Sequence, residues 1–278
     1  YYTDIFSAQG YRTLFIAMKT ISESDYKAWS DRLFKSELDL ENKNKLVAQC
    51  YNDIEKDFTI LGATIVEDKL QDNVPETIQD LRMAGIKIWM LTGDKIDTAE
   101  NISISCNLIS KGHKCFRIAP FNKKTQKHLS MSLKTKIPEL TMFYKEFSGY
   151  VQRHDHNLPP FSLLIESSIL GKIFRDEENT EHFLSLALRA ESVVCCRVSP
   201  LQKAQVVKKV KEIDSNHITL AIGDGGNDVS MILEAHVGVG IHGEEGMLAV
   251  QSSDFSIGEF KLLRHLLFFH GRNSLNRT

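Results

Sequence analysis

The sequence predicts an α/β fold in which a mostly parallel sheet carries helices on both faces. From about residue 58 onward, short apolar runs alternate with segments of helical spacing, which is the pattern of strand–helix–strand units. Two of these runs end in loops rich in glycine and aspartate, LTGDK at 91–95 and GDGGND at 223–228. Ligands of open α/β sheets bind at the carboxyl ends of strands, so these loops are the first candidates for a functional site.

Composition narrows the class of protein. A chain of 278 residues with a formal net charge of −2 fits one large domain or two smaller ones. That charge gives no general attraction to nucleic acid, so no nucleic-acid partner is predicted. The five cysteines include the pair Cys195 and Cys196 but no CxxC spacing, which favours reduced thiols in a cytosolic setting. No apolar run is long enough to span a bilayer, and the first residue is not Met. We therefore expect a soluble chain that is a piece of something longer.

The first 57 residues predict helices around one strand. Residues 1–21 have the pattern of a helix entering a strand, with Arg12 inside the apolar run GYRTLFIAM. Ser22 and Asp25 have the spacing of a capping box at the start of a helix. A second helix is expected over about 41–57.

Residues 58–108 have an alternating pattern of strands and helices, and residues 120–157 are rich in basic side chains. ILGATIV and IKIWM are predicted strands, separated by a helix that begins near Pro75 and ends at Gly85. A helix is expected over about 98–108. Residues 120–157 carry seven Lys or Arg against three acids, and we interpret them as a basic surface insertion, partly mobile. A solvated surface is favoured over a docking patch for lipid or a partner.

The alternation then resumes to the end of the chain. The predicted strands are FSLLIES, SVVCCRV, ITLAIG, VGVGI and DFSI. Helices are expected over about 180–190, from the capping box at Ser199 to about 213, and over about 260–270.

The GDGGND loop has the composition of a magnesium site. Asp224 and Asp228 supply carboxylates, Asn227 an amide, and the glycines let the loop turn tightly. Mg²⁺ prefers one or two carboxylates completed by water and substrate phosphate. Asp-Gly pairs also form ordinary turns, but the position between an apolar run and a helical stretch favours phosphate chemistry.

The LTGDK loop is a candidate phosphoryl site. It follows a predicted strand and precedes a predicted helix, so the Thr92 hydroxyl and the amides of Gly93 and Asp94 could donate to a phosphoryl group. Alone the motif is weak, because such loops are also ordinary turns. Together with GDGGND in an α/β chain it becomes persuasive.

Three cations are candidate anion ligands. Lys203, in the first turns of the predicted helix, could neutralise both a phosphate and a carboxylate nucleophile, although spacing alone favours an ordinary surface lysine. Arg197, just before that helix, could serve the same anion. Arg12 needs a partner if it is buried; a nucleotide phosphate and a structural carboxylate are both candidates.

Several segments together resemble the phospholipid-flippase (P4) branch of the P-type ATPases, in the haloacid-dehalogenase-like superfamily. They are LGATIVEDKLQDNVPETIQDLRMAGIKIWMLTGDK, CCRVSPLQKAQVV, AIGDGGNDVSMILEAHVGVGI and HGRNS. The resemblance covers nearly the whole chain apart from 120–157. The pieces EDKLQ, CCRVSPLQK and HGEEGMLAVQSSDFSI point to lipid flippases rather than ion pumps.

The resemblance implies a domain plan. Residues 1–21 would be the C-terminal remnant of a nucleotide-binding domain, and 22–278 a Rossmann-like phosphorylation domain carrying the insertion at 120–157. The cofactors would be ATP and Mg²⁺. The resemblance also implies roles for single residues. Thr92 would hold the phosphoryl group, with Gly93 beside it, whereas Asp94 and Arg12 would contact nucleotide. Lys203 would stabilise the phosphorylated carboxylate, Asp224 would hold Mg²⁺, and Asn227 and Asp228 would orient the phosphate and the metal shell.

One departure from the family pattern decides what the chain can do alone. The family's nucleophile is the aspartate of a DKTGT sequence after the central strand, and no such sequence occurs here. We therefore expect a sheet that is missing its central nucleophile strand, which would leave unpaired strand edges. A separate segment could supply the strand, the sheet could close without it, or the assembly could be altered.

The resulting functional prediction is a partial cytosolic region of an ATP-driven phospholipid flippase that works through an aspartyl phosphate. The chain would lie at the cytoplasmic face of a membrane, and the parent would carry phospholipid and could have an accessory subunit. The isolated chain is predicted to be inactive. The alternatives are a soluble phosphatase of the same superfamily and a non-catalytic module that binds Mg²⁺ or nucleotide.

Overall fold

The computed structural model divides the chain into two compact units, mainly Tyr11–Asp68 and mainly Lys69–Thr278. It describes residues 3, 5–6, 11–39, 42–66, 69–110, 112–120, 137–153, 159–213, 217–243 and 246–278. The domain division expected after residue 21 therefore differs from the structural one after residue 68. The reason is that the helices following residue 21 lie between two strands that pair with each other.

The first unit is a two-stranded ribbon with a helical hairpin. Strand β1 (Arg12–Met18) pairs antiparallel with β2 (Thr59–Val66). Between them lie α2 (Glu23–Glu37) and α3 (Lys43–Ile54). The expected capping box is confirmed, since Ser22 Oγ accepts from the Asp25 amide at 3.1 Å. The segment ILGATIV was expected to begin the parallel pattern, and this was wrong: the chain leaves β1 at Met18 and returns at its partner Thr59, which makes the pair antiparallel.

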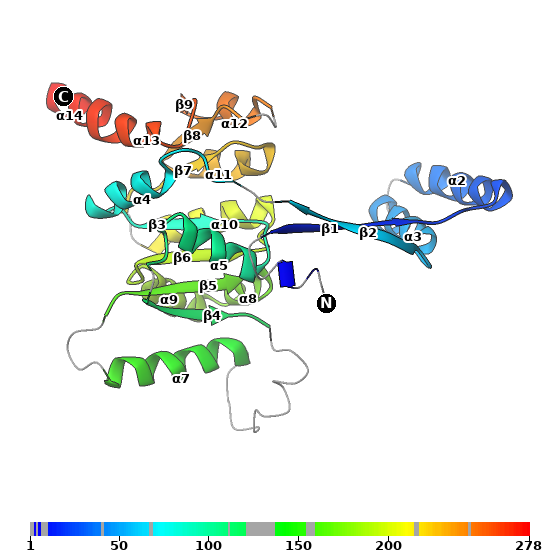
Figure 1. Cartoon of the computed structure of the whole chain (residues 1–278), viewed down its shortest axis with the longest axis horizontal. Helices are drawn as coiled ribbons and strands as arrows, with labels where there is room; N and C mark the ends of the chain where they lie inside the picture. The colour runs from blue at the N-terminus through cyan, green and yellow to red at the C-terminus, as the bar shows by residue number, and fades with distance from the viewer. Residues whose placement is uncertain are drawn as a thin grey trace. The chain divides into compact units, whose positions relative to one another are not determined.

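The second unit contains two parallel sheets (Figure 1). One has the strand order β3-β6-β5-β4 and the other β7-β8-β9. The strands of the first are β3 (Ile88–Leu91), β4 (Lys114–Ile118), β5 (Phe161–Glu166) and β6 (Ser192–Cys196). Those of the second are β7 (Leu220–Gly223), β8 (Val237–Ile241) and β9 (Phe255–Ile257).

Helices cover both faces of the four-stranded sheet, as predicted. Along β6, Val193 and Cys195 pack in one core cluster, and Val194 and Cys196 pack in another on the opposite face. The first cluster draws on α7 (Pro138–Arg153), α8 (Ser167–Ile173), α9 (Glu177–Ala187) and α10 (Pro200–Ile213). The second draws on α4 (Val74–Met83) and α5 (Ile96–Ser105). The α/β class with helices on both faces is confirmed.

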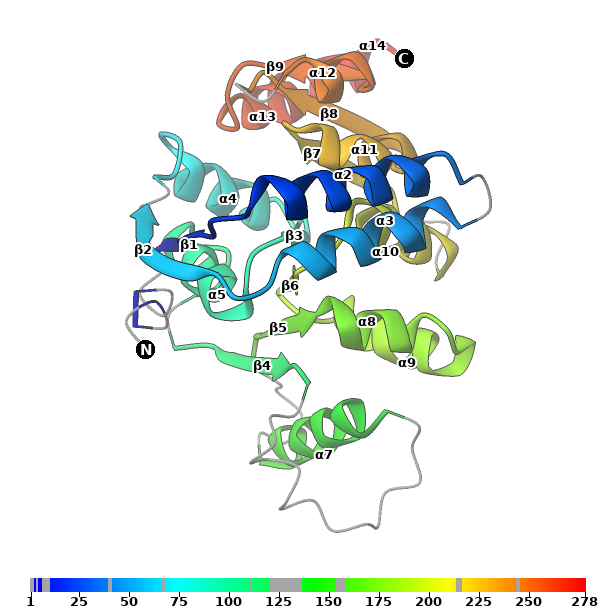
Figure 2. The same ribbon diagram turned by 90° about the vertical axis from the view of Figure 1, so that its right-hand side faces the viewer.

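Helix α7 corrects the interpretation of 120–157 as a surface insertion. Its rings Phe143, Phe147 and Tyr150 are buried and lie 5.5–5.6 Å from the ring of Phe116 on β4. Figures 1 and 2 show α7 lying beside β4. Of the seven basic residues counted in this segment only Lys145 and Arg153 fall in α7, and the helix carries an apolar stripe that belongs to the core. Residues 121–136 and 154–158 of the expected insertion lie outside the described residues.

Strands β3 and β7 are the facing edges of the two sheets. Ile88 of β3 packs in the same cluster as Leu220 and Ile222 of β7, so side chains join the sheets. No strand within the described residues hydrogen-bonds to the second side of β3 or of β7. This agrees with the prediction of a sheet that is missing its central strand.

The chain ends in short helices over the second sheet. The loop after β7 forms a 3-10 turn (Gly226–Asp228) and α11 (Val229–Glu234), and α12 (Leu248–Gln251) follows β8. The terminal helix consists of α13 (Leu262–His265), the π-helical turn η2 (Leu266–Gly271) and α14 (Arg272–Arg277). Among the helices described, none combines the length and the apolar character needed to cross a membrane.

Candidate functional site at the carboxyl ends of the strands

The loops after β3 and β6 are held together by backbone hydrogen bonds. The Thr92 amide donates to the Cys195 carbonyl at 2.9 Å, and the Val198 amide donates to the Thr92 carbonyl at 3.0 Å. The Arg197 amide donates to the Asp94 carbonyl at 3.0 Å, and Arg197 has a left-handed backbone (φ 56°) that turns its loop. LTGDK and RVSP, about 100 residues apart in sequence, therefore form one rigid platform.

Within this platform Thr92 and Asp94 position each other. Thr92 Oγ1 donates to Asp94 Oδ2 at 2.8 Å and accepts from the Asp94 amide at 3.1 Å. A Cβ atom on Gly93 would meet no atom within 4 Å, so the backbone between them faces open space. The first turn of α5 begins two residues later, at Ile96. This geometry suits an anion approaching the loop from outside.

The GDGGND loop folds back on itself. A Cβ on Gly223 would lie 2.4 Å from the Cβ of Asp228, so only glycine lets the Asp228 side chain return to the start of the loop. A Cβ on Gly243, after β8, would lie 3.2 Å from the Cβ of Asp224. The tight turn predicted from the glycines is confirmed. The contact of Gly243 with Asp224 was missed, although a glycine just after a strand at the same edge was a usable signal.

Lys203 joins the two halves of the site. Its Nζ lies 2.7 Å from Asp228 Oδ1, and both side chains are only 13% exposed. Lys203 comes from the first turn of α10, which the predicted capping box starts: the Ser199 amide donates to Gln202 Oε1 at 3.0 Å. Ser230 Oγ of α11 also donates to the Pro200 carbonyl at 2.9 Å. Loops that follow β6 and β7 are thus fixed against each other by direct bonds.

The remaining predicted residues occupy two places. Asn227 lies in the 3-10 turn beside Asp228, in the same loop as the carboxylates. Arg12 lies in the first unit at the start of β1, where its backbone pairs with Val66.

The carboxylates fit Mg²⁺ better than a metal held wholly by protein. No group of three or more His, Cys, Asp or Glu that could hold a metal occurs in the part of the chain that the structure describes. Zinc-type sites require such groups, whereas Mg²⁺ takes one or two carboxylates and completes its shell with water and phosphate. Asp224 and Asp228 match this donor set, and Asp228 already balances one positive charge, that of Lys203.

The thiol at this edge is not a nucleophile. Burial raises the pKa of Cys196, and together with the negative charges of Glu166 and Asp94 it brings that pKa to about 12. A thiol with such a pKa stays protonated at neutral pH. The chemistry of the site therefore depends on its oxygen and nitrogen groups.

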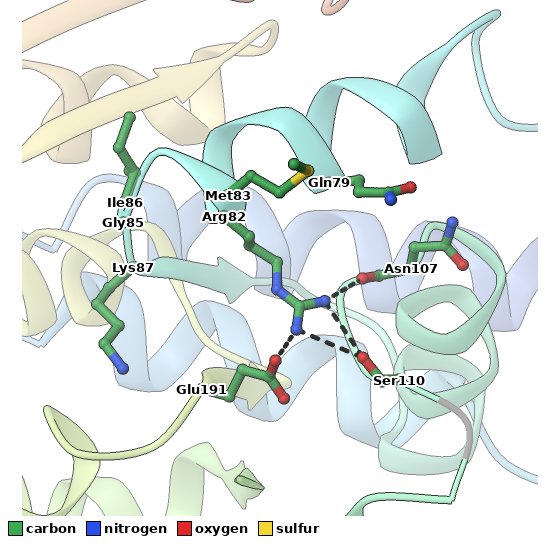
Figure 3. A pocket seen from close by; sticks show the side chains of 9 residues that line it. All are labelled: Gln79, Arg82, Met83, Gly85, Ile86, Lys87, Asn107, Ser110 and Glu191. Atoms are coloured by element: carbon green, nitrogen blue, oxygen red, sulfur yellow. Dashed lines mark hydrogen bonds and ion pairs between the residues drawn. The ribbon is translucent and has the colours of Figure 1, made fainter.

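A pocket lies at the opposite edge of the sheet (Figure 3). It measures about 660 Å³, and its lining includes Lys87 and Glu191, the residues just before β3 and β6. At its centre Arg82 pairs with Glu191 and donates to the Asn107 carbonyl at 2.7 Å. Burial lowers the pKa of Arg82.

The bonds of Arg82 in this pocket connect separate elements of the fold, which indicates a structural role. The guanidinium also reaches Ser110 Oγ, and His113 Nδ1 lies 2.7 Å from the second oxygen of Glu191. Arg82 thereby links α4, the turn after α5 and the entry to β6. Sequence reasoning missed this cluster, because an arginine near the end of an amphipathic helix carries no distinguishing signal.

Comparisons with known proteins agree with the geometry. Residues 250–278 match the family model for the phospholipid-translocating P-type ATPase C-terminal region. The chain is 44% identical over 98% of its length to phospholipid-transporting ATPase DRS2 of Saccharomyces cerevisiae, of which it covers 19%. It is 43% identical over 99% of its length to DNF1 of Chaetomium thermophilum, covering 18% of that protein. It is 38% identical over 95% of its length to phospholipid-transporting ATPase IH of Homo sapiens, covering 24%. The chain thus spans about a fifth of the length of these relatives.

Proposed function

We propose that this chain is part of the ATP-driven machinery of a phospholipid flippase. Nearly the whole length of the chain is similar to a segment of phospholipid-transporting ATPases. The matches confirm the family resemblance predicted from the motifs. The parent would phosphorylate and dephosphorylate an aspartate at the cytoplasmic face of a membrane and couple this cycle to lipid translocation. An accessory subunit would accompany it, as in many flippases of this type.

The observation that carries the proposal is the ion pair between Lys203 and Asp228. It brings together two motifs that are 25 residues apart, beside a platform made by a third motif, LTGDK. A lysine and carboxylates that are largely screened from water, next to open loop backbone, can stabilise a phosphoryl group as its charge shifts during transfer. An ordinary surface lysine does not explain a side chain that is 13% exposed.

The chain's residues then have distinct tasks. Thr92 and the amides of Gly93 and Asp94 would bind and orient the phosphoryl oxygens. Lys203 would offset the charge of the phosphorylated carboxylate, and Asn227 would orient the phosphate. Arg197 would serve the same anion as Lys203. Arg12, in the first unit, would contact nucleotide. Asp224 and Asp228 would hold Mg²⁺, which when bound supplies electrostatic stabilisation of the transferring group.

The nucleophile would come from another segment of the parent. The edges of β3 and β7, to which no further strand pairs among the described residues, face each other within one unit and are joined by side chains of one cluster. A parallel strand placed there would satisfy both edges, and a carboxylate just after it would emerge between the LTGDK and GDGGND loops. This supports supply of the strand by a separate segment over closure of the sheet without it.

Phosphorylation by labelled ATP tests the proposal. The membrane-embedded parent should form an acid-stable phosphoenzyme in the presence of Mg²⁺, and vanadate should inhibit its ATPase activity. The isolated chain of 278 residues should form none. An acid-stable burst from the isolated chain would overturn the assignment of the nucleophile to another segment.

Fractionation of source cells separates the proposed function from its competitors. An antibody against this chain should detect a band several times larger than 31.6 kDa that only detergent extracts from membranes. A soluble band at the size of the chain would contradict the flippase and favour a soluble phosphatase or a binding module. Vanadate-sensitive turnover of that soluble protein would then indicate the phosphatase.

A further inference from the structure

The first turn of α10 carries Lys203 and is tied to neighbouring elements on two sides. On the side of β7, Ser230 Oγ of α11 donates to the Pro200 carbonyl at 2.9 Å. On the other side lies β5, which pairs with β6 away from β3. The tie on that side is the side chain of Gln202, the residue just before Lys203.

The two ends of the Gln202 amide make different bonds. Its Oε1 accepts from the Ser199 amide at 3.0 Å, which completes the capping box of α10. Its Nε2 donates to the Ser167 carbonyl at 3.2 Å, where β5 ends and α8 begins. A Cβ atom on Gly171 of α8 would lie 3.6 Å from this Nε2, so the amide lies directly against α8.

The anchor of the second bond is rigid. Ile169 and Leu170, in the same turn of α8 as Ser167, are at most 1% exposed. They pack in the core cluster that covers one face of the four-stranded sheet. The Ser167 carbonyl is therefore held in a fixed position, and Gln202 transmits that position to the start of α10.

Helix capping alone does not explain a glutamine at this position. The capping box takes either Glu or Gln three residues after the cap, and a carboxylate could accept from the Ser199 amide as well. An ionised carboxylate has no proton to donate to the Ser167 carbonyl, whereas the amide of Gln202 has two. The bond to α8 is therefore the property that distinguishes Gln202 from a glutamate.

The placement of the Lys203 ammonium group depends on the same turn. Lys203 Nζ lies 2.7 Å from Asp228 Oδ1, and the two residues follow different strands. The backbone of Lys203 is joined directly to that of Gln202, so a shift of the turn moves the ammonium group relative to Asp228. A misplacement of about 1 Å in a catalytic site can lower a rate by about 100-fold.

We propose that Gln202 is a positioning residue whose bond to Ser167 fixes the first turn of α10 and so holds Lys203 against Asp228 at the phosphoryl site. This inference rests on the proposed function, because Gln202 acts on the reaction only through Lys203. A purely structural role of Gln202 would instead lower the stability of the fold and leave turnover normal.

Steady-state ATP hydrolysis by the membrane-embedded parent is the test. Gln202→Glu keeps the cap and loses the bond to Ser167, so it should lower kcat by about tenfold, within the range for a displaced catalytic group. The KM for ATP should change by less than about twofold, because the residues proposed to contact nucleotide are not moved. Gln202→Met lacks a donor and adds no charge, and it should lower kcat by at least as much.

Two control variants separate the position of Lys203 from added charge and from helix stability. Gln205→Glu makes the same chemical change at an exposed position three residues later in α10 and should leave kcat unchanged. Ser199→Ala weakens the same cap, since Ser199 Oγ accepts from the Gln202 amide at 3.4 Å, but it keeps the bond to Ser167. It should also leave kcat unchanged. A loss of kcat in either control equal to that of Gln202→Glu would overturn the proposal.

A double variant tests whether Gln202 acts through Lys203. In a Lys203→Ala background, Gln202→Glu should change the remaining turnover by less than about twofold, because residues that act as one unit are not additive. A full further loss of about tenfold would overturn the proposal.

The remaining outcomes distinguish this inference from the proposed function. Normal kcat in both Gln202 variants, with Lys203→Ala impaired, would overturn the positioning role and leave the proposed function intact. Normal turnover of Lys203→Ala would overturn the proposed function and this inference with it. Circular dichroism of the 278-residue chain should show that every variant keeps the native fold. Loss of the fold in both Gln202 variants would overturn the positioning role in favour of a structural one.

Discussion

The two edges of the four-stranded sheet both contain a largely buried ion pair, but the pairs are built differently. At the carboxyl edge Lys203 and Asp228 are each 13% exposed and lie between loops that contain several glycines. At the amino edge Arg82 and Glu191 are 18% and 23% exposed, and Arg82 also donates to the Asn107 carbonyl and to Ser110 Oγ. Similar burial thus serves two ends. The loop backbone beside Lys203 and Asp228 is open to a ligand, whereas the pair of Arg82 and Glu191 links neighbouring elements of the fold.

The two edges of the sheet also differ in which charged side chains they carry. Asp94, Asp224 and Asp228 gather with Glu166 at the carboxyl edge, which suits a divalent cation. At the amino edge two cations, Arg82 and Lys87, and one carboxylate, Glu191, line the pocket. The lesson is that neither burial nor pocket volume identifies a functional site by itself. What distinguishes the carboxyl edge is that its charged groups lie beside backbone with open space.

The largest expected effect tests Lys203 in the parent protein. Lys203→Ala should lower the rate of phosphoenzyme turnover by at least about 100-fold, since removing one preorganised charged donor has this scale of effect. Lys208→Ala, an exposed lysine in the same helix, should leave the rate unchanged. ATPase assays with membranes containing each variant provide the measurement. A Lys203 variant with normal turnover would make this pair structural, like the one at the other edge.

The second prediction concerns stability at the amino edge. Arg82→Ala should lower the free energy of unfolding by about 2–3 kcal/mol, because it leaves Glu191 partly buried without its main partner. Arg264→Ala breaks an exposed pair with Asp80 (side chains 46% and 41% exposed) and should cost less than about 1 kcal/mol. Urea unfolding of the chain measures both. A loss for Arg82→Ala no larger than that for Arg264→Ala would contradict the structural role of the pair at the amino edge.

A third prediction tests the close approach at Gly223. Gly223→Ala places a methyl group against Asp228 and should lower the unfolding free energy by about 1–2 kcal/mol, the usual scale of an overpacked contact. Gly93→Ala enters open space and should change it by less than about 0.5 kcal/mol. Thermal unfolding of the two variants checks the difference. Equal losses would mean that the loop relaxes away from the contact.

The smallest effect compares thiols near the two edges. Burial raises the pKa of Cys115 to about 11, and the nearby Lys114 partly opposes this rise. Nearby carboxylates contribute to the pKa of about 12 for Cys196. Iodoacetamide titrations followed by mass spectrometry should therefore modify Cys115 at lower pH than Cys196 in the folded chain. Modification of Cys196 first would contradict the acidic character of the carboxyl edge.

The same shifts fix the sign of a pH effect on stability. The folded thiols have pKa values above their ordinary value of 9.0, so the unfolded chain loses protons first as the pH rises. Their contribution to stability is complete below about pH 9 and is lost toward pH 11–12, by at most about 1.4 kcal/mol per pH unit and thiol. Urea unfolding should therefore become easier across that range.

Much of the second unit could be predicted from sequence, because its signals are local. The capping box at Ser199, the end of α4 at Gly85 (φ 82°) and the loops after β3 and β7 all appear where local chemistry places them. The link from Lys203 to Asp228 could not be derived from spacing, since it depends on two strands being brought side by side. The resemblance to a family implied a role for each residue at a phosphoryl site, but it did not predict the contact between them.

The errors arose where tertiary packing overrides a local pattern. Basic residues made α7 look like a solvated insertion, although Phe143, Phe147 and Tyr150 bury its inner face. Strand β2 looked like the start of a parallel sheet, but pairing with β1 is set by where the helical hairpin returns the chain. Arg82 gave no signal, because its partners come from distant turns.

The pairing of β3 with β6 has a consequence for how quickly the second unit assembles. Ile88 aligns with Ser192, about 100 residues away, whereas β5 aligns with β6 across only about 30 residues. Closing the longer loop loses more chain entropy, so β4, β5 and β6 should associate first and β3 should dock last. Trp89, one of only two tryptophans, lies in β3. Its fluorescence should therefore change in the late phase of refolding, after most of the helical circular dichroism has returned.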